Sequence, residues 1–256
     1  MLKYIISIFF LFVSILGVSQ SKTIDLNKKD SVVYKEPYGI RVGADLSRLA
    51  KNFYNNDYSG FELTGDYRIT HNLYIAAELG NENNTRQEDY FNFTTTGSYL
   101  KIGADINMYE NWYGMNNTIF IGGRYAYSTF SHKINSYQIY DPNRYWYPDD
   151  FVEGAANLSE FSSLNASWLE FVLGTKVELF TNLYLGASVR LGFLVSNKSD
   201  DQFANIWIPG FNKVTEGSKF GTGYNYSISY LIPLYKKAKK KKKEDPKTVN
   251  NTQTKN

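Results

Sequence analysis

Between Tyr38 and Tyr235 the chain alternates apolar and polar residues with a period of two, and this pattern recurs in eight segments. Residues 99–106, for example, read Tyr-Leu-Lys-Ile-Gly-Ala-Asp-Ile. Successive side chains of a β-strand point to opposite faces, so each segment predicts a strand with one apolar and one polar face. Most segments are about 9–11 residues long, which is the length that a tilted strand needs to cross a bilayer.

The connections between these segments also alternate in length. Short connections at 70–72, 108–117 and 181–182 alternate with long ones at 48–59, 81–96, 131–167 and 195–220. Short turns at one end and long loops at the other are typical of outer-membrane barrels, in which the turns lie in the periplasm. The pattern predicts an all-β fold: an eight-stranded antiparallel transmembrane β-barrel, built as an up-and-down meander and located in a bacterial outer membrane.

The polar face of the predicted strands carries charges of both signs. These residues are Arg41, Arg68, Lys101, Arg124, Lys176 and Arg190, with Asp45, Glu62, Asp66, Glu78, Asp105, Glu170 and Glu178. Six basic side chains in lipid, at ~2–4 kcal/mol each, would cost roughly 12–24 kcal/mol, which exceeds the stability of a typical fold. We therefore expect this face to line the lumen as an ion-pair network.

Two further observations favour a membrane barrel over a soluble barrel with an apolar interior. Glycines recur on the polar face, and small residues suit the crowded interior of a narrow barrel. Aromatic residues gather towards both ends of the apolar face, with Tyr38, Tyr67 and Tyr230 at the expected periplasmic end. Their amphipathic rings suit the boundary between membrane and water.

Residues 1–19 have the pattern of a secretory signal peptide. Lys3 precedes an apolar run from Tyr4 to Val13, and residues 17–19 supply the small residues of a cleavage site. A retained membrane anchor is the alternative, but the run is shorter than the ~20 residues of a spanning helix. We expect residues 20–37 to form a periplasmic linker and residues 38–235 to form the barrel.

Residues 236–256 form a lysine-rich tail, which we expect to be disordered and periplasmic. Nine lysines against Glu244 and Asp245 give this tail a charge of +7, and seven of the lysines lie between Lys236 and Lys243. A periplasmic segment meets no nucleic acid. Contact with anionic lipid headgroups, at about 1 kcal/mol per lysine, is one interpretation of the run, and a solvated tail is the other.

The composition restricts the chemistry that the chain can perform. Cysteine is absent, and His71 and His132 are its two histidines, so we expect no disulfide, metal centre or cofactor. His132 lies just past a predicted strand, in phase with the lumen-facing residues, and is a weak candidate for a catalytic base. A lipid-modifying hydrolase or acyltransferase would depend on it. The competing interpretation is a histidine at the base of a loop that is bonded to solvent.

The predicted lumen leaves little room for a channel. Tyr74, Tyr99 and Tyr184 share the polar face with the charged residues. The interior of an eight-stranded barrel is just wide enough for side chains to fill it. We therefore expect a closed lumen, with a narrow pore as the alternative.

The third long connection is dense in Tyr and Trp beside Asp, Asn and Arg, a composition typical of binding surfaces that also suits a loop packed on itself. The candidate binding residues are Tyr140, Arg144, Tyr145, Trp146 and Tyr147. We expect a structural or surface-interaction protein that contacts outer-membrane lipid and binds a surface ligand or protein through residues 131–167 and 195–220.

The chain also resembles the small outer-membrane β-barrel families of Bacteroidota, many of which are uncharacterised, and the OmpA/OmpX type of architecture. The resemblance covers about Tyr38–Tyr235. It rests on the signal peptide, the tyrosine-rich strands and the repeated elements Gly43-Ala44-Asp45, Gly65-Asp66, Gly103-Ala104-Asp105 and Gly123-Arg124. No catalytic signature accompanies it, so it implies fold and location alone.

Overall fold

The computed structural model describes residues 35–109, 116–140, 151–153, 160–200, 204–215 and 217–238. Eight long strands form the wall of a barrel: β1 (Lys35–Asp45), β2 (Tyr58–Arg68), β3 (Leu73–Gln87), β4 (Phe91–Asn107), β5 (Thr118–Tyr140), β7 (Glu160–Phe180), β8 (Leu183–Lys198) and β11 (Phe220–Ala238). The smaller elements are α2 (Leu46–Tyr54), β6 (Phe151–Glu153), β9 (Trp207–Ile208) and β10 (Asn212–Lys213).

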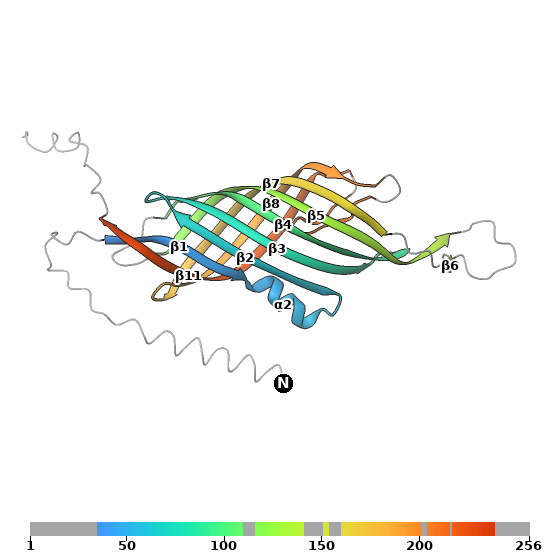
Figure 1. The fold of residues 1–256 in the computed structure, drawn as a ribbon, viewed down its shortest axis with the longest axis horizontal. Coiled ribbons are helices and arrows are strands. Elements are labelled where there is room, and N and C mark those ends of the chain that lie inside the picture. Colours follow the sequence, from blue (N-terminus) through green and yellow to red (C-terminus); the bar gives the residue numbers. More distant parts are fainter. Residues whose placement is uncertain are drawn as a thin grey trace, which may run out of the picture. The chain divides into compact units, whose positions relative to one another are not determined.

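Each long strand pairs with its neighbours in the chain, always antiparallel, and β1 pairs with β11 to close the barrel (Figure 1). The turns after β2, β4 and β7 lie at one end, which we call the turn end. The connections after β1, β3, β5 and β8 lie at the other, which we call the loop end. The predicted all-β, eight-stranded antiparallel meander is confirmed.

The apolar faces of the strands point outward and the polar faces point inward. Leu79, Ile102 and Val189 are 55%, 52% and 57% exposed. Tyr74, Tyr99 and Tyr184 are buried in the lumen, as predicted. The outward apolar side chains form a continuous band around the wall, which we call the apolar belt. On β7 it runs from Leu169 to Leu179, ten residue steps or about 33 Å along the strand.

The wall is longer than the sequence pattern predicted. β3 and β4 pair without interruption up to Gln87 and Asn92, so most of the loop expected at 81–96 is a hairpin. Beyond the apolar belt the outward face is mainly polar and the inward face mixes polar residues with Phe93, so the alternation used to recognise strands is lost there. Cross-strand bonds replace it, such as the hydroxyl pair Thr85–Thr94 at 2.8 Å. The loop expected at 131–167 is likewise shortened by the extensions of β5 and β7.

The start of the barrel corrects two expectations. β1 begins at Lys35, three residues before the predicted boundary. A bulge between Tyr38 and Gly39 then shifts the register against β11, so Tyr38 is buried instead of facing outward. Its ring stacks on Tyr235 with centroids 5.4 Å apart. Gly39 permits this close pairing because a Cβ there would collide with the carbonyl oxygen of Ile232.

A helix stands where the sequence predicted the end of a strand and a loop. Asp45 caps α2, since its Oδ1 accepts hydrogen bonds from Ser47 N at 2.7 Å and Ser47 Oγ at 2.6 Å. Residues 46 and 47, expected in the strand, therefore start the helix. Across the described ranges, no helix has the length and apolar character needed to traverse a bilayer.

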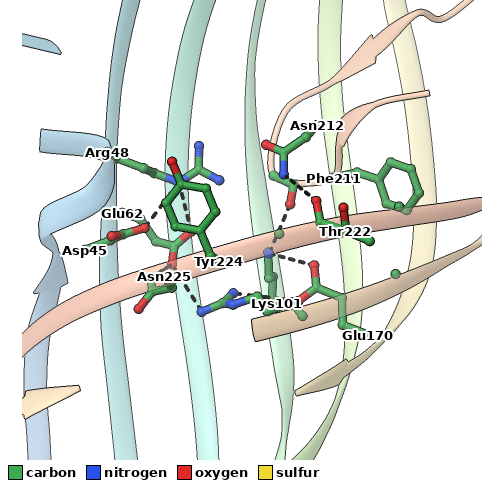
Figure 2. A pocket seen from close by; sticks show the side chains of 15 residues that line it. Asp45, Arg48, Glu62, Lys101, Glu170, Phe211, Asn212, Thr222, Tyr224 and Asn225 are labelled. Atoms are coloured by element: carbon green, nitrogen blue, oxygen red, sulfur yellow. Dashed lines mark hydrogen bonds and ion pairs between the residues drawn. The ribbon is translucent and has the colours of Figure 1, made fainter. Parts of the chain in front are cut away.

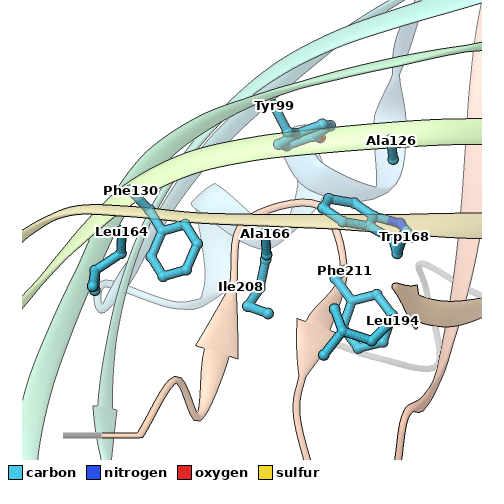
Figure 3. Close-up of a cluster of buried hydrophobic side chains, with 9 residues drawn as sticks. All are labelled: Tyr99, Ala126, Phe130, Leu164, Ala166, Trp168, Leu194, Ile208 and Phe211. Atoms are coloured by element: carbon cyan, nitrogen blue, oxygen red, sulfur yellow. The ribbon is translucent and has the colours of Figure 1, made fainter. Parts of the chain in front are cut away.

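Residues 204–215, which we call the plug segment, fold from the loop end into the mouth of the barrel. They contain the short hairpin of β9 and β10. Ile208 and Phe211 join a buried cluster with Tyr99, Trp168 and Leu194 (Figure 3). The sequence predicted a surface loop over 195–220, and this apolar core inside the lumen was not foreseen.

Candidate functional site: the lumen and its loop-end mouth

The centre of the lumen holds a chain of ion pairs between opposite walls. Lys101 on β4 contacts Glu170 on β7 at 2.7 Å. Arg190 on β8 binds Glu78 on β3 directly and lies 3.6 Å from Glu170. Arg124 and Asp105, on adjacent strands, form a two-pronged contact at 2.7 and 2.9 Å. Every one of these side chains is buried.

A second layer of pairs lies towards the turn end. Asp66 accepts from Arg41 at 2.7 Å and from Lys176 at 2.5 Å, and the Arg41 guanidinium lies 4.8 Å from the Tyr74 ring centre. Closest to the turns, Arg68 contacts the carboxylate of Glu36 at 2.7 Å.

His71 completes this turn-end layer. Its Nδ1 lies 2.7 Å from the same Glu36 oxygen that Arg68 contacts. The imidazole therefore joins the turn after β2 to the start of β1.

At the loop end, the guanidinium of Arg48 on α2 points into the lumen. Arg48 contacts Glu82 at 2.8 Å and Glu62 at 3.2 Å, and it donates to the Tyr58 hydroxyl at 2.9 Å. Tyr99 donates to the same Glu62 carboxylate. Figure 2 shows this group, with Arg48 and Glu62 on one side and Lys101 with Glu170 on the other.

The plug segment is held by these charged groups. Glu82 accepts from the indole nitrogen of Trp207 at 3.0 Å and from Gly210 N at 3.2 Å. Lys101 donates to the Gly210 carbonyl oxygen at 3.1 Å. At the loop end, the ion-pair network therefore fixes the plug segment, which covers the mouth of the lumen.

The structure brings together most of the predicted lumen residues, with two placed differently. Asp45 caps α2 and lies 3.7 Å from Arg48, at the edge of the network. Glu178 sits at the turn after β7, where its Oε1 accepts from Asn182 N at 2.9 Å. Asp45 thus caps a helix and Glu178 holds a turn, and both side chains also face the lumen.

Sequence reasoning missed three members of the network: Glu36, Arg48 and Glu82. Glu82 continues the inward phase of Glu78, so extending the alternation past residue 79 would have found it. Arg48 belongs to a helix whose apolar residues recur at helical spacing. Glu36 has no such signal, because the bulge that turns it inward follows it in the chain.

His132 lies inside the barrel on the extension of β5 beyond the apolar belt, so the interpretation as a solvent-bonded loop histidine is wrong. The ring is fully buried, with centroids 5.8 Å from Phe93 and 5.2 Å from Phe130. Nδ1 and the Thr95 hydroxyl are 2.8 Å apart. Burial lowers the His132 pKa to about 4, because it penalises the charged ring. A hydroxyl and an imidazole meet here, but neither is accessible to a substrate.

Three cavities lined by described residues of the lumen are small. They measure about 20 Å³ beside Arg48, 30 Å³ beside Arg41 and 20 Å³ beside Arg68. Each has room for about one or two water molecules. Within the described ranges, no group of three potential metal-ligating side chains comes together.

The candidate binding residues of the third long connection are not described by the structure. Arg144, Tyr145, Trp146 and Tyr147 lie outside the described residues, as does the side chain of Tyr140.

Comparisons with known proteins identify a family and a structural likeness. A family model described as a domain of unknown function, DUF6048, matches residues 1–237. The crystal structure of Neisserial surface protein A (NspA) is similar with a TM-score of 0.41 and 10% identity, over 78% of this chain and 99% of that one. No curated protein matches.

Proposed function

We propose that this chain, which belongs to the DUF6048 family, is an outer-membrane β-barrel that acts as a structural or surface-interaction protein with a closed lumen. The observation that carries the proposal is the reversal of polarity across the wall. Apolar side chains cover the outside, while ion pairs fill the inside. The bacterial outer membrane is the location in which barrels of this kind reside.

The height of the apolar belt supports this location. The stretch from Leu169 to Leu179 is about 33 Å along the strand, and a tilt of ~40° reduces it to about 25 Å, the apolar height of such barrels. An outer hollow of about 580 Å³ between Tyr125, Leu169 and Phe193 is lined mainly by outward apolar groups. Soluble monomers rarely expose an apolar patch larger than a few hundred Å². The apolar belt, which runs around the whole wall, is larger than such a patch.

Folding in two environments tests the proposed location. Residues 20–256, refolded with detergent micelles or lipid vesicles, are expected to gain β-structure and to migrate as a compact species in unheated gel electrophoresis. Without detergent they are expected to aggregate. A folded monomer in plain buffer would overturn the proposal.

The packed lumen supports a role other than transport. The cavities beside Arg41, Arg48 and Arg68 hold only a few waters, and the plug segment covers the mouth. The protein in planar bilayers is expected to show no steady conductance. Stepwise channel openings by the wild-type chain would replace the closed-lumen proposal with the narrow-pore alternative.

The interaction role is assigned to the loop end, chiefly to residues 131–167. The fold of 204–215 supports this emphasis, because it takes Trp207, Ile208 and Phe211 into the lumen and away from any partner. Proteolysis of intact cells is expected to cut within 131–167. Cuts confined to residues 239–256 would mean the opposite orientation.

The proposal for the turn end is contact with anionic lipid headgroups through the lysine run. Lys236 and Lys237, at the end of β11, are exposed, and Lys237 lies 5.0 Å from the ring centre of Tyr38. A chain ending after residue 238 is expected to bind vesicles with anionic lipid less strongly than the full chain.

We also propose that the chain is related to the small outer-membrane β-barrels of Bacteroidota that it resembles.

A further inference from the structure

Helix α2 is amphipathic, and its orientation is unusual for a helix at the surface of a protein. Its polar residues Ser47, Arg48, Lys51 and Asn52 share one side, and its apolar residues Leu46, Leu49, Ala50, Phe53 and Tyr54 share the other. The polar side faces the barrel and the apolar side faces away from it. A helix packed on a soluble core has the reverse arrangement.

The polar side is fixed to the barrel by several contacts. Arg48 reaches the carboxylates inside the lumen. The Lys51 ammonium lies 3.7 Å from the Tyr58 ring centre, and burial lowers the Lys51 pKa. Asn52 exchanges two hydrogen bonds with the backbone of Gly60, at 2.8 and 3.0 Å. The helix therefore cannot rotate to hide its apolar side without breaking these bonds.

The described chain leaves most of the apolar side uncovered: Leu46 and Leu49 are half-buried, and the side chains towards the end of the helix are exposed. Phe53 is 90% exposed and Tyr54 is 72% exposed. The helix starts directly after β1, whose outward Val42 belongs to the apolar belt. The hydrogen bonds of Asn52 join the helix to Gly60, which lies beside the outward Phe61. Figure 1 shows α2 directly between the end of β1 and the start of β2. Its exposed apolar residues therefore continue the belt at its loop-end edge.

We propose that the apolar side of α2 is a lipid-binding surface that lies in the outer leaflet, at the boundary between acyl chains and headgroups. This inference rests on the proposed outer-membrane location. Interfacial helices bury their apolar side about 5–10 Å into this boundary, and aromatic side chains are the residues favoured there. Arg48 joins the helix to Glu82, which also holds the plug segment.

Site-directed spin labelling tests the proposal, because the chain contains no cysteine to replace first. Single variants Phe53→Cys, Tyr54→Cys, Val42→Cys and Tyr90→Cys carry a nitroxide in the full chain, refolded into vesicles that contain lipopolysaccharide in their bilayer. Collision rates with oxygen and with a water-soluble nickel chelate report whether each label lies in lipid or in water. Val42 is the control for the belt, and Tyr90, exposed in the turn after β3, is the control for water.

We expect labels at 42, 53 and 54 to favour oxygen and the label at 90 to favour the nickel chelate. The ratio at 53 should exceed that at 90 at least severalfold. A lipid-exposed label at 42 with water-exposed labels at 53 and 54 would overturn the role of α2 and leave the membrane location intact. A water-exposed label at 42 in folded protein would overturn the membrane location itself. Both 53 and 54 are exposed, so cysteine at either position leaves the packing of the barrel intact.

Discussion

Glu82 on β3 binds Trp207 of the plug segment across the mouth of the lumen, with the indole nitrogen 3.0 Å from the carboxylate oxygen. The two residues are 125 positions apart in the chain. This contact joins the ion-pair network to the segment that covers it. Both side chains are buried, so neither can exchange its partner for water without moving.

Replacing Trp207 with Phe should therefore weaken the plug segment. Phe keeps an aromatic six-membered ring at this position, but the pyrrole ring with its N–H donor is lost and Glu82 keeps one fewer bond. A buried acceptor that loses a partner costs about 1–3 kcal/mol. Urea unfolding in micelles should show this loss of stability. Lys213→Ala, at an exposed position of the same segment, is the control and should change stability by less than about 0.5 kcal/mol.

The central ion pair gives a second prediction. Arg190→Leu takes from the buried Glu78 its closest partner and leaves it Arg124 at 3.5 Å, and breaking a buried pair on one side costs about 3–5 kcal/mol. The double variant Arg190→Leu/Glu78→Leu should recover much of that loss, because no single charge is then stranded. Unfolding free energies of the single and double variants measure both effects. A double variant no more stable than the single one would contradict the strength assigned to this pair.

The apolar belt predicts a difference between two outward positions. Leu173 on β7 lies near the middle of the belt and Thr129 on β5 lies beyond it, and both face outward. Arginine at 173 should cost about 2–4 kcal/mol, whereas arginine at 129 should cost about 0–1 kcal/mol. Refolding into vesicles followed by guanidinium titration gives both values. Equal costs would mean that 173 does not contact lipid.

His132 predicts a pH dependence of stability. Its pKa is lowered to about 4 in the folded chain, against about 6.5 when unfolded. The unfolded chain therefore binds more protons between these values, and stability falls as the pH drops from about 6.5 to about 4. The loss should reach up to about 3 kcal/mol. It should shrink in His132→Gln, which removes the titrating group, and the difference between the two profiles separates it from the carboxylates.

The same His132→Gln variant tests the enzymatic alternative. Cells that express it and cells that express the wild type are expected to have identical lipid A profiles, because the ring is buried between Phe93 and Phe130. A profile that changes with the substitution, at equal amounts of folded protein, would establish lipid-modifying chemistry.

Gly210 predicts a steric effect in the plug segment. Its φ is +83°, and a Cβ there would lie 2.6 Å from the Tyr99 ring. Gly217 has a similar φ of +73° with nothing near its Cβ, so Gly217→Ala reports the backbone cost alone, about 1–2 kcal/mol. Gly210→Ala should be more destabilising than Gly217→Ala in the same unfolding assay. Equal effects would show that Tyr99 moves aside freely.

The sequence was sufficient for the wall of the barrel because lipid and lumen impose opposite polarity on alternate residues. That constraint ends where the wall leaves the belt. The hairpin around Asn84 and the extension of β5 to Tyr140 carry polar residues on both faces, so no alternation marked them. Tyr38 was misplaced for a different reason, because the register of β1 against β11 is irregular between Tyr38 and Gly39 and the alternation does not continue across it.

The plug segment and α2 escaped prediction because long-range contacts define them. Trp207 and Ile208 are ordinary loop residues until Glu82 and Trp168 are placed beside them by strands far away in the chain. The helix is short, and its apolar residues face away from the core. Composition and pattern indicated a lumen filled by charge, but the choice of partners within it depends on the register of all eight strands.

The extension of β5 carries the wall of the barrel well beyond the apolar belt. From Tyr127 at the edge of the belt to Tyr140, the strand advances roughly 40 Å along its own direction, or roughly 30 Å along the membrane normal at a tilt of ~40°. A large molecule that approaches the membrane from the loop end therefore meets the far end of β5 before it meets the belt.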